Sequence, residues 1–345
     1  MYDNNYIENI SNFKSALVEY FNSQEFLTLT SSMTGDYFAN NYLKDLINIC
    51  TNGKCVRSYL VNLIYHLFGG KDENLIIKAS ASYELFEGSV LAHDDIIDKS
   101  EIRRSAPSLY VKLGNNHIGL SRAICVGDFG LIFANEIINQ LNINYLIKQK
   151  AITHQTKVYL TTISGELLDV DISNGNSVLE NNIIEMYKEK TANYTIAGPM
   201  ELGAILANQN DRIIKRLHDI GINLGVAFQI KDDILGVFSD TSVIGKSNTS
   251  DSVEGKKTIL ISHFDEVADS DAKSKFYSFY GTESAKDNID TIKRLLEENN
   301  CLAYANQKLE EYYNNAITLI DDSEFDINIK KSLKDFANYI LNRNR

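Results

Sequence analysis

The sequence HDDIID at residues 93–98 decides the fold expected of this chain. Its carboxylates lie inside an apolar segment with helical spacing, and the sequence QIKDDIL at residues 229–235 repeats the arrangement much later in the chain. Carboxylates are costly among apolar neighbours unless a positive charge neutralises them. The two sequences together predict divalent metal ions held between two helices.

The spacing within the first cluster suits a metal ion. Asp94 and Asp98 are four residues apart and share one helix face, with Asp95 beside them. Like charges at that spacing destabilise a helix, so a bridging hard cation would explain them. Mg²⁺ typically takes one or two protein carboxylates and completes its shell with water and phosphate oxygens. A solvated acidic turn is the alternative, and the apolar residues on both sides count against it.

Helical spacing of apolar residues recurs along almost the whole chain. The 345 residues include only two prolines, which permits long uninterrupted helices, and alternating strand patterns are scarce. The expected fold is all-α, a large single-domain helical bundle over residues 1–345. A split into two helical domains is the alternative, although no boundary is marked. We predict helices at residues 73–98, 119–141, 144–170, 181–206 and 211–238, with polar breaks at 173–177, 240–255 and 265–275.

Composition and charge exclude several classes of protein. The 34 basic and 46 acidic residues give a net charge of −12, which argues against a nucleic-acid binder because such proteins need basic surface. The four cysteines are scattered without a CxxC pair, as expected of reduced thiols in the cytoplasm. The amino terminus does not resemble a signal peptide, and no run of about 18 apolar residues predicts a membrane anchor. We expect a soluble cytoplasmic protein.

Basic residues recur around both aspartate clusters. Arginine forks suit phosphate groups, and lysine supplies a mobile positive charge. Singly, each basic residue is best explained as surface solvation, but their order relative to the aspartates favours phosphate binding. They are Lys54, Arg57, Arg103, Arg104, Lys190, Lys246, Lys256 and Lys257.

Six short motifs follow one another over residues 53–258. They are GKCVR at 53–57, DDIID at 94–98, RRSAPS at 103–108, KT at 190–191, FQIKDD at 228–233 and GKSNTSDSVEGKKT at 245–258. In this order they resemble the motifs of the trans-prenyl diphosphate synthases, also called polyprenyl synthetases, and the chain looks most like the bacterial geranylgeranyl diphosphate synthases. The ordered set is specific, although no single motif is.

The resemblance implies an isoprenoid-synthase bundle with a deep central cavity, usually a homodimer, and a Mg²⁺-dependent transferase. The implied metal ligands are Asp94, Asp98 and Asp232, supported by Asp95 and Asp233. The implied catalytic residues are Asp94, Asp95, Asp98, Lys190, Asp232 and Lys246. The allylic diphosphate would be held by Arg103, Lys190, Lys246 and Lys256, and isopentenyl diphosphate by Lys54, Arg57 and Arg104. Thr191 and Gln229 would line the reacting carbons.

The implied reaction is chain elongation by a prenyltransferase, which condenses an allylic diphosphate with isopentenyl diphosphate. Ionisation of the allylic carbon–oxygen bond leaves a diphosphate anion, which metal ions and lysines stabilise. The double bond of isopentenyl diphosphate then attacks the carbocation. Water must be excluded from this cation.

Three positions depart from the family pattern. The second motif ends in Gly236, where many members have a third aspartate, and Ser58 follows Arg57 where proline is usual. Glu87 stands where His or Gln is usual, and a carboxylate beside a diphosphate should repel it. Glu87 is therefore protonated, paired with Lys54 or Arg57, or turned away; otherwise the second substrate is lost.

Glu87 leaves a terpene synthase as one alternative, an enzyme that ionises and cyclises a single allylic diphosphate. The retained Lys54, Arg57 and Arg104 favour the elongating enzyme instead. A non-catalytic regulatory subunit is a second alternative, and the intact first cluster counts against it.

The residues just before the first cluster bear on product length. In the resembled family, aromatic side chains at the positions of Ser89 and Val90 close the cavity and stop the product at C15. The small residues here predict geranylgeranyl diphosphate, C20, with C25 or longer as the alternative. Phe129 and Phe133 are the predicted floor of the cavity.

Overall fold

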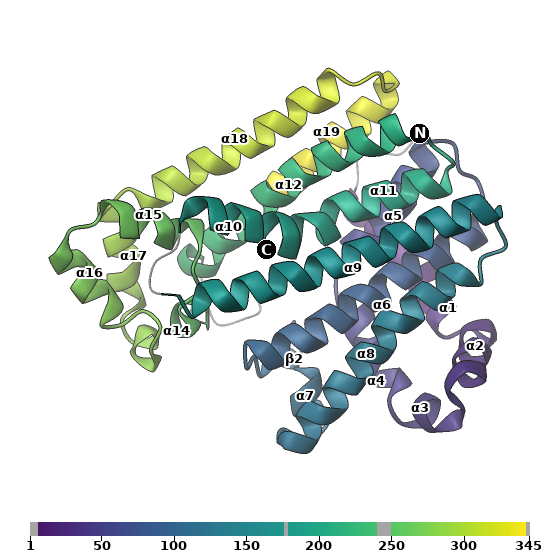
Figure 1. Ribbon diagram of the computed structural model, residues 1–345, viewed down its shortest axis with the longest axis horizontal. Helices are drawn as coiled ribbons and strands as arrows, with labels where there is room; N and C mark the ends of the chain where they lie inside the picture. Colours follow the sequence, from purple (N-terminus) through teal and green to yellow (C-terminus); the bar gives the residue numbers. More distant parts are fainter. Residues whose placement is uncertain (1–5, 176–178, 240–249, 343–345) are drawn as a thin grey trace. The chain divides into compact units, whose positions relative to one another are not determined.

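The computed structural model describes residues 6–175, 179–239 and 250–342 (Figure 1). Within these residues the elements are helices, apart from a hairpin of β1 (Ile102–Arg103) and β2 (Ala106–Pro107). The all-α prediction is confirmed. The chain forms two compact units, unit 1 (Met1–Tyr159 and Gly198–Leu217) and unit 2 (Leu160–Ala197 and His218–Arg345). The single domain over residues 1–345 and its central cavity stay predictions.

Unit 1 contains the first aspartate cluster. It includes the start of α9 (Tyr145–Ser173) and the start of α12 (Asp211–Phe238). Its other helices are α1 (Tyr6–Phe21), α2 (Gln24–Thr34), α3 (Asp36–Asn41), α4 (Leu43–Thr51), α5 (Val56–Leu67), α6 (Glu73–Ile97), α7 (Leu109–Lys112), α8 (His117–Asn139) and α11 (Gly198–Leu206).

The long helices α6 and α8 lie side by side (Figure 1). Each begins at a capping side chain: Asp72 accepts a hydrogen bond from the Leu75 amide at 2.9 Å, and Asn116 accepts one from the Ile118 amide at 2.9 Å. Gly130 on α8 lies so close to Ser89 that a side chain there would collide with the Ser89 hydroxyl. Small residues therefore set the close approach of the two helices.

Helix α8 is long and apolar enough to cross a membrane, and no other described helix is. Length and composition alone give this result, and the core helices of soluble proteins pass the same test. In unit 1, Phe133 and Ile137 of α8 are buried. The predicted absence of a membrane anchor stays a prediction.

Unit 2 contains the remainder of α9 and α12. Its other elements are α10 (Glu180–Met186), the π-helix η1 (Tyr187–Ala197), α14 (Ser250–Glu254), α15 (Ile259–Val267), α16 (Ser270–Tyr277), the 3₁₀ helix η2 (Glu283–Lys286), α17 (Ile289–Glu298), α18 (Cys301–Asp321) and α19 (Ile327–Asn342).

The polar stretch at 265–275 was wrongly predicted to be a break. Helix α16 begins within it because Asp269 caps the helix, accepting a hydrogen bond from the Ala272 amide at 2.8 Å. Phe276, which is fully buried, anchors the same helix in the core of unit 2. One cap and one buried aromatic ring thus suffice for a short helix of polar composition.

Candidate active site

The first aspartate cluster lies at the C-terminal end of α6. Arg103 contacts two of its carboxylates: Nε donates to Asp95 Oδ1 at 2.7 Å, and Nη2 donates to Asp94 Oδ2 at 2.7 Å. Burial opposes the charge on Arg103, but Asp94 and Asp95 outweigh it and raise the pKa of the guanidinium. Asp98 caps α6 one turn beyond Asp94. The structure therefore places all three predicted aspartates and Arg103 at one helix end.

Two neighbouring arginines diverge at the hairpin. Arg103 ends β1, whereas Arg104 and Ser105 form the turn with φ of 53° and 62°, in the left-handed region. Nη1 of Arg104 donates to the Ile49 carbonyl at 3.2 Å. The guanidinium also lies against Gly53, where any side chain would collide with it. The glycine of the GKCVR motif therefore makes room for Arg104.

Glu87 is the carboxylate that Arg104 shares with Arg57. Its Oε1 accepts from Arg57 Nη1 at 2.8 Å and from Arg104 Nη2 at 2.7 Å. The Glu87 side chain is 3% exposed, against 15% for Arg57 and 28% for Arg104. Of the arrangements foreseen for Glu87, the structure has the ion pair with Arg57. Lys54 is exposed just before α5.

Glu84 lies one turn before Glu87 on α6, and sequence analysis missed it. It is 1% exposed; Ser58 Oγ donates to its Oε1 at 2.6 Å, whereas Oε2 has no hydrogen-bond partner among the described residues. Burial, followed by the charge of Glu87, raises the pKa of Glu84 to about 8. The carboxyl is therefore mostly protonated at neutral pH. Its spacing of three residues from Glu87 is the sequence feature that could have identified it.

Lys190 lies between two carboxylates in unit 2. Its Nζ is 2.5 Å from Asp169 Oδ2 and 2.9 Å from Glu166 Oε2. Gly165 allows this approach, because a side chain there would collide with the Lys190 backbone. The sequence GELLD at 165–169 supplies the glycine and both carboxylates, and none of the predicted site residues lies in it.

Lys190 and its neighbours form a π-helix, Tyr187–Ala197, instead of the α-helix predicted over 181–206. π-helical turns occur frequently at functional sites. Gly221 and Gly225 of α12 face this segment, and a side chain at either position would collide with its backbone. Two glycines on one face of α12 thus accommodate the wider π-helix.

Asp233 is the buried member of the second aspartate cluster. Gln229 Nε2 donates to its Oδ1 at 2.8 Å, and the Tyr187 hydroxyl donates to its Oδ2. Thr191 Oγ1 in turn donates to Gln229 Oε1 at 2.8 Å. Burial raises the pKa of Asp233 to about 8, although the two hydrogen bonds oppose the rise. The structure thus brings Thr191, Gln229 and Asp233 together, with Asp232 half-buried beside them.

Lys256 contacts carboxylates of α14. Its Nζ is 3.3 Å from Glu254 Oε2 and 3.7 Å from Asp251 Oδ1. The Asp251 carboxylate also lies against Gly236, so that a side chain there would collide with it. A third aspartate at 236 would need Asp251 to move, which gives a physical reason for the glycine. Lys246 lies outside the described residues.

The predicted product-length residues lie where α6 meets α8. Ser89 is fully buried against Gly130, whereas Val90 is half-buried. Phe129 and Phe133 of α8 stack with their ring centroids 5.0 Å apart. The predicted floor residues thus lie on the helix that packs against Ser89, and their role stays a prediction.

The donor chemistry of the aspartate clusters fits Mg²⁺. No three His, Cys, Asp or Glu side chains among the described residues converge as a preformed metal site. Mg²⁺ does not require such a group, because one or two carboxylates suffice when phosphate oxygens and water supply the rest. The oxygen ligands offered by both clusters are those that a hard cation prefers.

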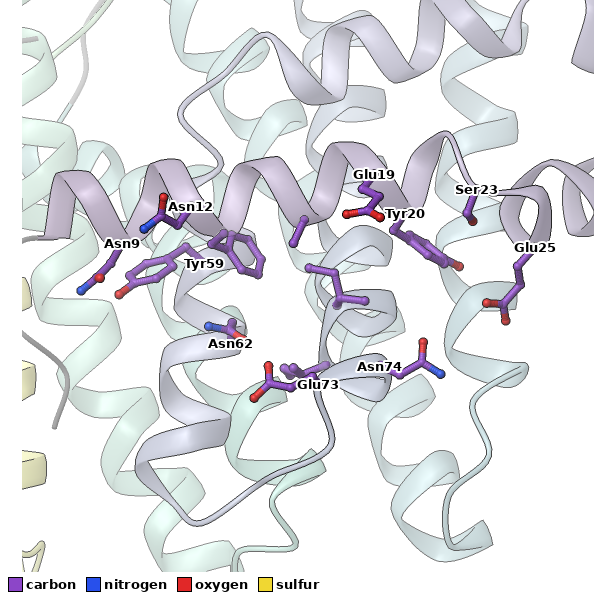
Figure 2. Close-up of a pocket in the computed structure, with 14 residues that line it drawn as sticks. Asn9, Asn12, Glu19, Tyr20, Ser23, Glu25, Tyr59, Asn62, Glu73 and Asn74 are labelled. Carbon is purple, nitrogen blue, oxygen red and sulfur yellow. The ribbon is translucent and has the colours of Figure 1, made fainter.

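A pocket of about 570 Å³ lies elsewhere in unit 1, lined by α1, the start of α2, α5 and the start of α6 (Figure 2). Of the described residues that line it, none is Lys or Arg. Its polar lining consists chiefly of Asn9, Asn12, Asn62, Asn74, Glu19, Glu25 and Glu73. Glu25 pairs with Lys78, which does not line the pocket, so the lining offers carboxylates and amides but no Lys or Arg to bind a diphosphate. The pocket is therefore a poor diphosphate site.

Comparisons with known proteins agree on one family. Residues 40–298 match the model described as polyprenyl synthetase. The geranylgeranyl diphosphate synthase of Sulfolobus acidocaldarius is 32% identical over 305 residues, 86% of this chain and 88% of that protein. The geranylgeranyl diphosphate synthase of Saccharolobus solfataricus is 32% identical over 303 residues, 85% of this chain and 87% of that protein.

A solved structure shows the same fold. The geranylgeranyl pyrophosphate synthase of Corynebacterium glutamicum, complexed with isoprenyl diphosphate and magnesium, has a TM-score of 0.86 at 24% identity, covering 98% of this chain and 99% of that one. The predicted likeness to bacterial members is therefore confirmed only in part, because this structure is bacterial whereas the two sequence relatives are archaeal.

Proposed function

Because this chain belongs to the polyprenyl synthetase family, we propose that it joins an allylic diphosphate to isopentenyl diphosphate and releases geranylgeranyl diphosphate. The chain is a prenyltransferase, in keeping with the family match over residues 40–298. One observation carries the two-substrate reaction: Arg57 and Arg104 share the single oxygen Glu87 Oε1. Two guanidinium groups brought together at one buried carboxylate suit the binding of a diphosphate, and a one-substrate enzyme would not need this second cationic group.

The allylic diphosphate would be held by Arg103, Lys190, Lys246 and Lys256, and isopentenyl diphosphate by Lys54, Arg57 and Arg104. Mg²⁺ at Asp94, Asp98 and Asp232, supported by Asp95 and Asp233, would stabilise charge on the leaving diphosphate. The cationic side chains add fixed positive charge where that anion develops.

Thr191 and Gln229 would line the reacting carbons. Their mutual hydrogen bond satisfies the Thr191 hydroxyl and the Gln229 carbonyl, so neither group needs water. A carbocation beside them is shielded from premature quenching. The double bond of isopentenyl diphosphate attacks this cation, and the released diphosphate accepts the proton that is lost.

We also propose a homodimer through α8. Ile118, Cys125 and Ile132 are spaced by seven residues and are exposed, so they form one line on that helix. Ile124 is exposed beside them. An exposed apolar face of this kind marks a protein interface. The cytoplasmic location stays a prediction.

The deciding experiment incubates the purified chain with Mg²⁺ and farnesyl or geranyl diphosphate, with and without isopentenyl diphosphate, and identifies the products by mass spectrometry. We expect a C20 diphosphate only when isopentenyl diphosphate is present. A hydrocarbon or alcohol from the allylic substrate alone would replace the proposal with a terpene synthase. An inactive chain that activates a second subunit would replace it with a regulatory role.

A further inference from the structure

The buried carboxyl of Glu84 has no place in the reaction described above. It lies among charged and titratable side chains of its own helix and of the segments packed against it. These are Glu87 on α6, Arg57 on α5, Cys55 just before α5, Arg104 after β1 and Cys50 on α4. Lys14 of α1 lies beside Cys55, where its Nζ donates to the Gly53 carbonyl at 2.9 Å. Burial raises the pKa of both thiols above the usual range, so both stay neutral near neutral pH.

We propose that Glu84 and Glu87 regulate isopentenyl diphosphate binding: Glu87 fixes the two arginines, and an uncharged Glu84 keeps the group positive. Glu84 acts through its neighbours and is a positioning residue. The proposal rests on the proposed function, because it concerns the affinity of the same arginines for the second substrate.

The charge of the group follows from its members. Arg57 and Arg104 carry two positive charges, and Glu87 carries one negative charge. Ionisation of Glu84 adds one negative charge beside these arginines. A diphosphate is therefore attracted more strongly when Glu84 is protonated than when it is ionised.

The direction of the pH dependence follows from the pKa of Glu84. That pKa is about 8, so the carboxyl holds its proton below this pH and loses it above. The second pKa of a phosphate monoester is about 6, so the substrate itself is already ionised in this range. The KM for isopentenyl diphosphate should rise above pH 8, by up to about tenfold for each further pH unit.

The experiment measures the KM for isopentenyl diphosphate and for farnesyl diphosphate between about pH 6.5 and 9.5, at saturating Mg²⁺. We expect only the KM for isopentenyl diphosphate to rise. Glu84→Gln, which is neutral at every pH, should keep this KM level. Ser58→Ala removes the hydrogen bond that lowers the pKa of Glu84, so it should move the midpoint to higher pH.

Glu201→Gln is the matched control. Glu201 lies in the same unit, 13% exposed and 3.5 Å from His154, outside the arginine group, and the variant should retain the wild-type profile. A level wild-type profile, or a rise that persists in Glu84→Gln, would overturn this inference while leaving the elongation reaction standing. Absence of elongated product at every pH would overturn both proposals.

Discussion

The cations predicted to bind the two diphosphates differ in how many carboxylates they contact. Arg57 and Arg104, assigned to isopentenyl diphosphate, share one carboxylate. Lys190, assigned to the allylic diphosphate, lies between two carboxylates, and Arg103 likewise contacts two. We therefore expect the arginine pair to bind an anion directly. We expect the allylic group, with two carboxylates around each cation, to need added metal ions before it attracts a diphosphate.

Removal of Mg²⁺ should have the largest effect of the changes considered, and it should affect the two groups differently. Chelation of Mg²⁺ should lower elongation by at least about a thousandfold, since a bound metal ion supplies several kcal/mol of stabilisation to the developing charge. Binding of isopentenyl diphosphate alone, measured by calorimetry, should persist in chelator. Equal loss of both would mean that the two groups do not differ in their need for metal ions.

Replacing Lys190 should reveal the repulsion between the two carboxylates that it contacts. In Lys190→Ala, Glu166 and Asp169 lose the lysine that lies between them, and we expect the free energy of unfolding to fall by about 3 kcal/mol. The kcat should fall by about a hundredfold through lost stabilisation of the diphosphate.

Lys188→Ala is the control for Lys190→Ala. Its ion pair with Glu185 is exposed, and neither denaturation midpoint nor kcat should change. A Lys190→Ala protein as stable as this control would show that the two carboxylates tolerate each other without the lysine.

Arg104→Lys tests the arginine pair assigned to isopentenyl diphosphate. Lysine keeps the charge but cannot contact both Glu87 and the Ile49 carbonyl through a fork. We expect the KM for isopentenyl diphosphate to rise about tenfold, with the KM for the allylic substrate unchanged. Arg294→Lys, an exposed position paired with Glu298, is the matched control in steady-state kinetics. A rise in both KM values would remove the separation between the two groups.

Substitutions at the residues predicted to set product length should have the smallest effect on rate. Val90 is half-buried, so Val90→Phe should shorten the main product from C20 to C15 with little change in kcat. Ser89→Phe should instead lower stability, by about 1–3 kcal/mol, because Ser89 is packed against Gly130. Mass spectrometry of products and thermal denaturation distinguish the two. An unchanged product in both variants would remove these residues from length control.

The sequence was sufficient for the main helices of the site. The predicted segments 73–98 and 211–238 agree with α6 and α12, because long apolar periodicity and few prolines leave little alternative. The pairing of Arg103 with the first aspartates also fits its predicted place beside them. The π-helix escaped prediction, because the room for it comes from Gly221 and Gly225 on α12, a distant segment that local spacing does not reveal.

Other parts of the site depend on contacts between distant segments. Glu84 meets Ser58 across 26 positions of sequence, and its protonation follows from burial that spacing alone does not reveal. The contact between Asp251 and Gly236 is of the same kind. Such partners emerge only when helices are packed, since polar residues are individually compatible with exposed positions.

The left-handed turn at Arg104 and Ser105 has an evolutionary consequence. Adjacent codons specify two arginines that contact different carboxylates, Arg103 with Asp94 and Asp95, and Arg104 with Glu87. A point mutation can therefore change the contacts of one arginine without changing those of the other. Insertion or deletion of a single codon in the hairpin would misdirect both at once, so selection should hold the length of this hairpin more tightly than its composition.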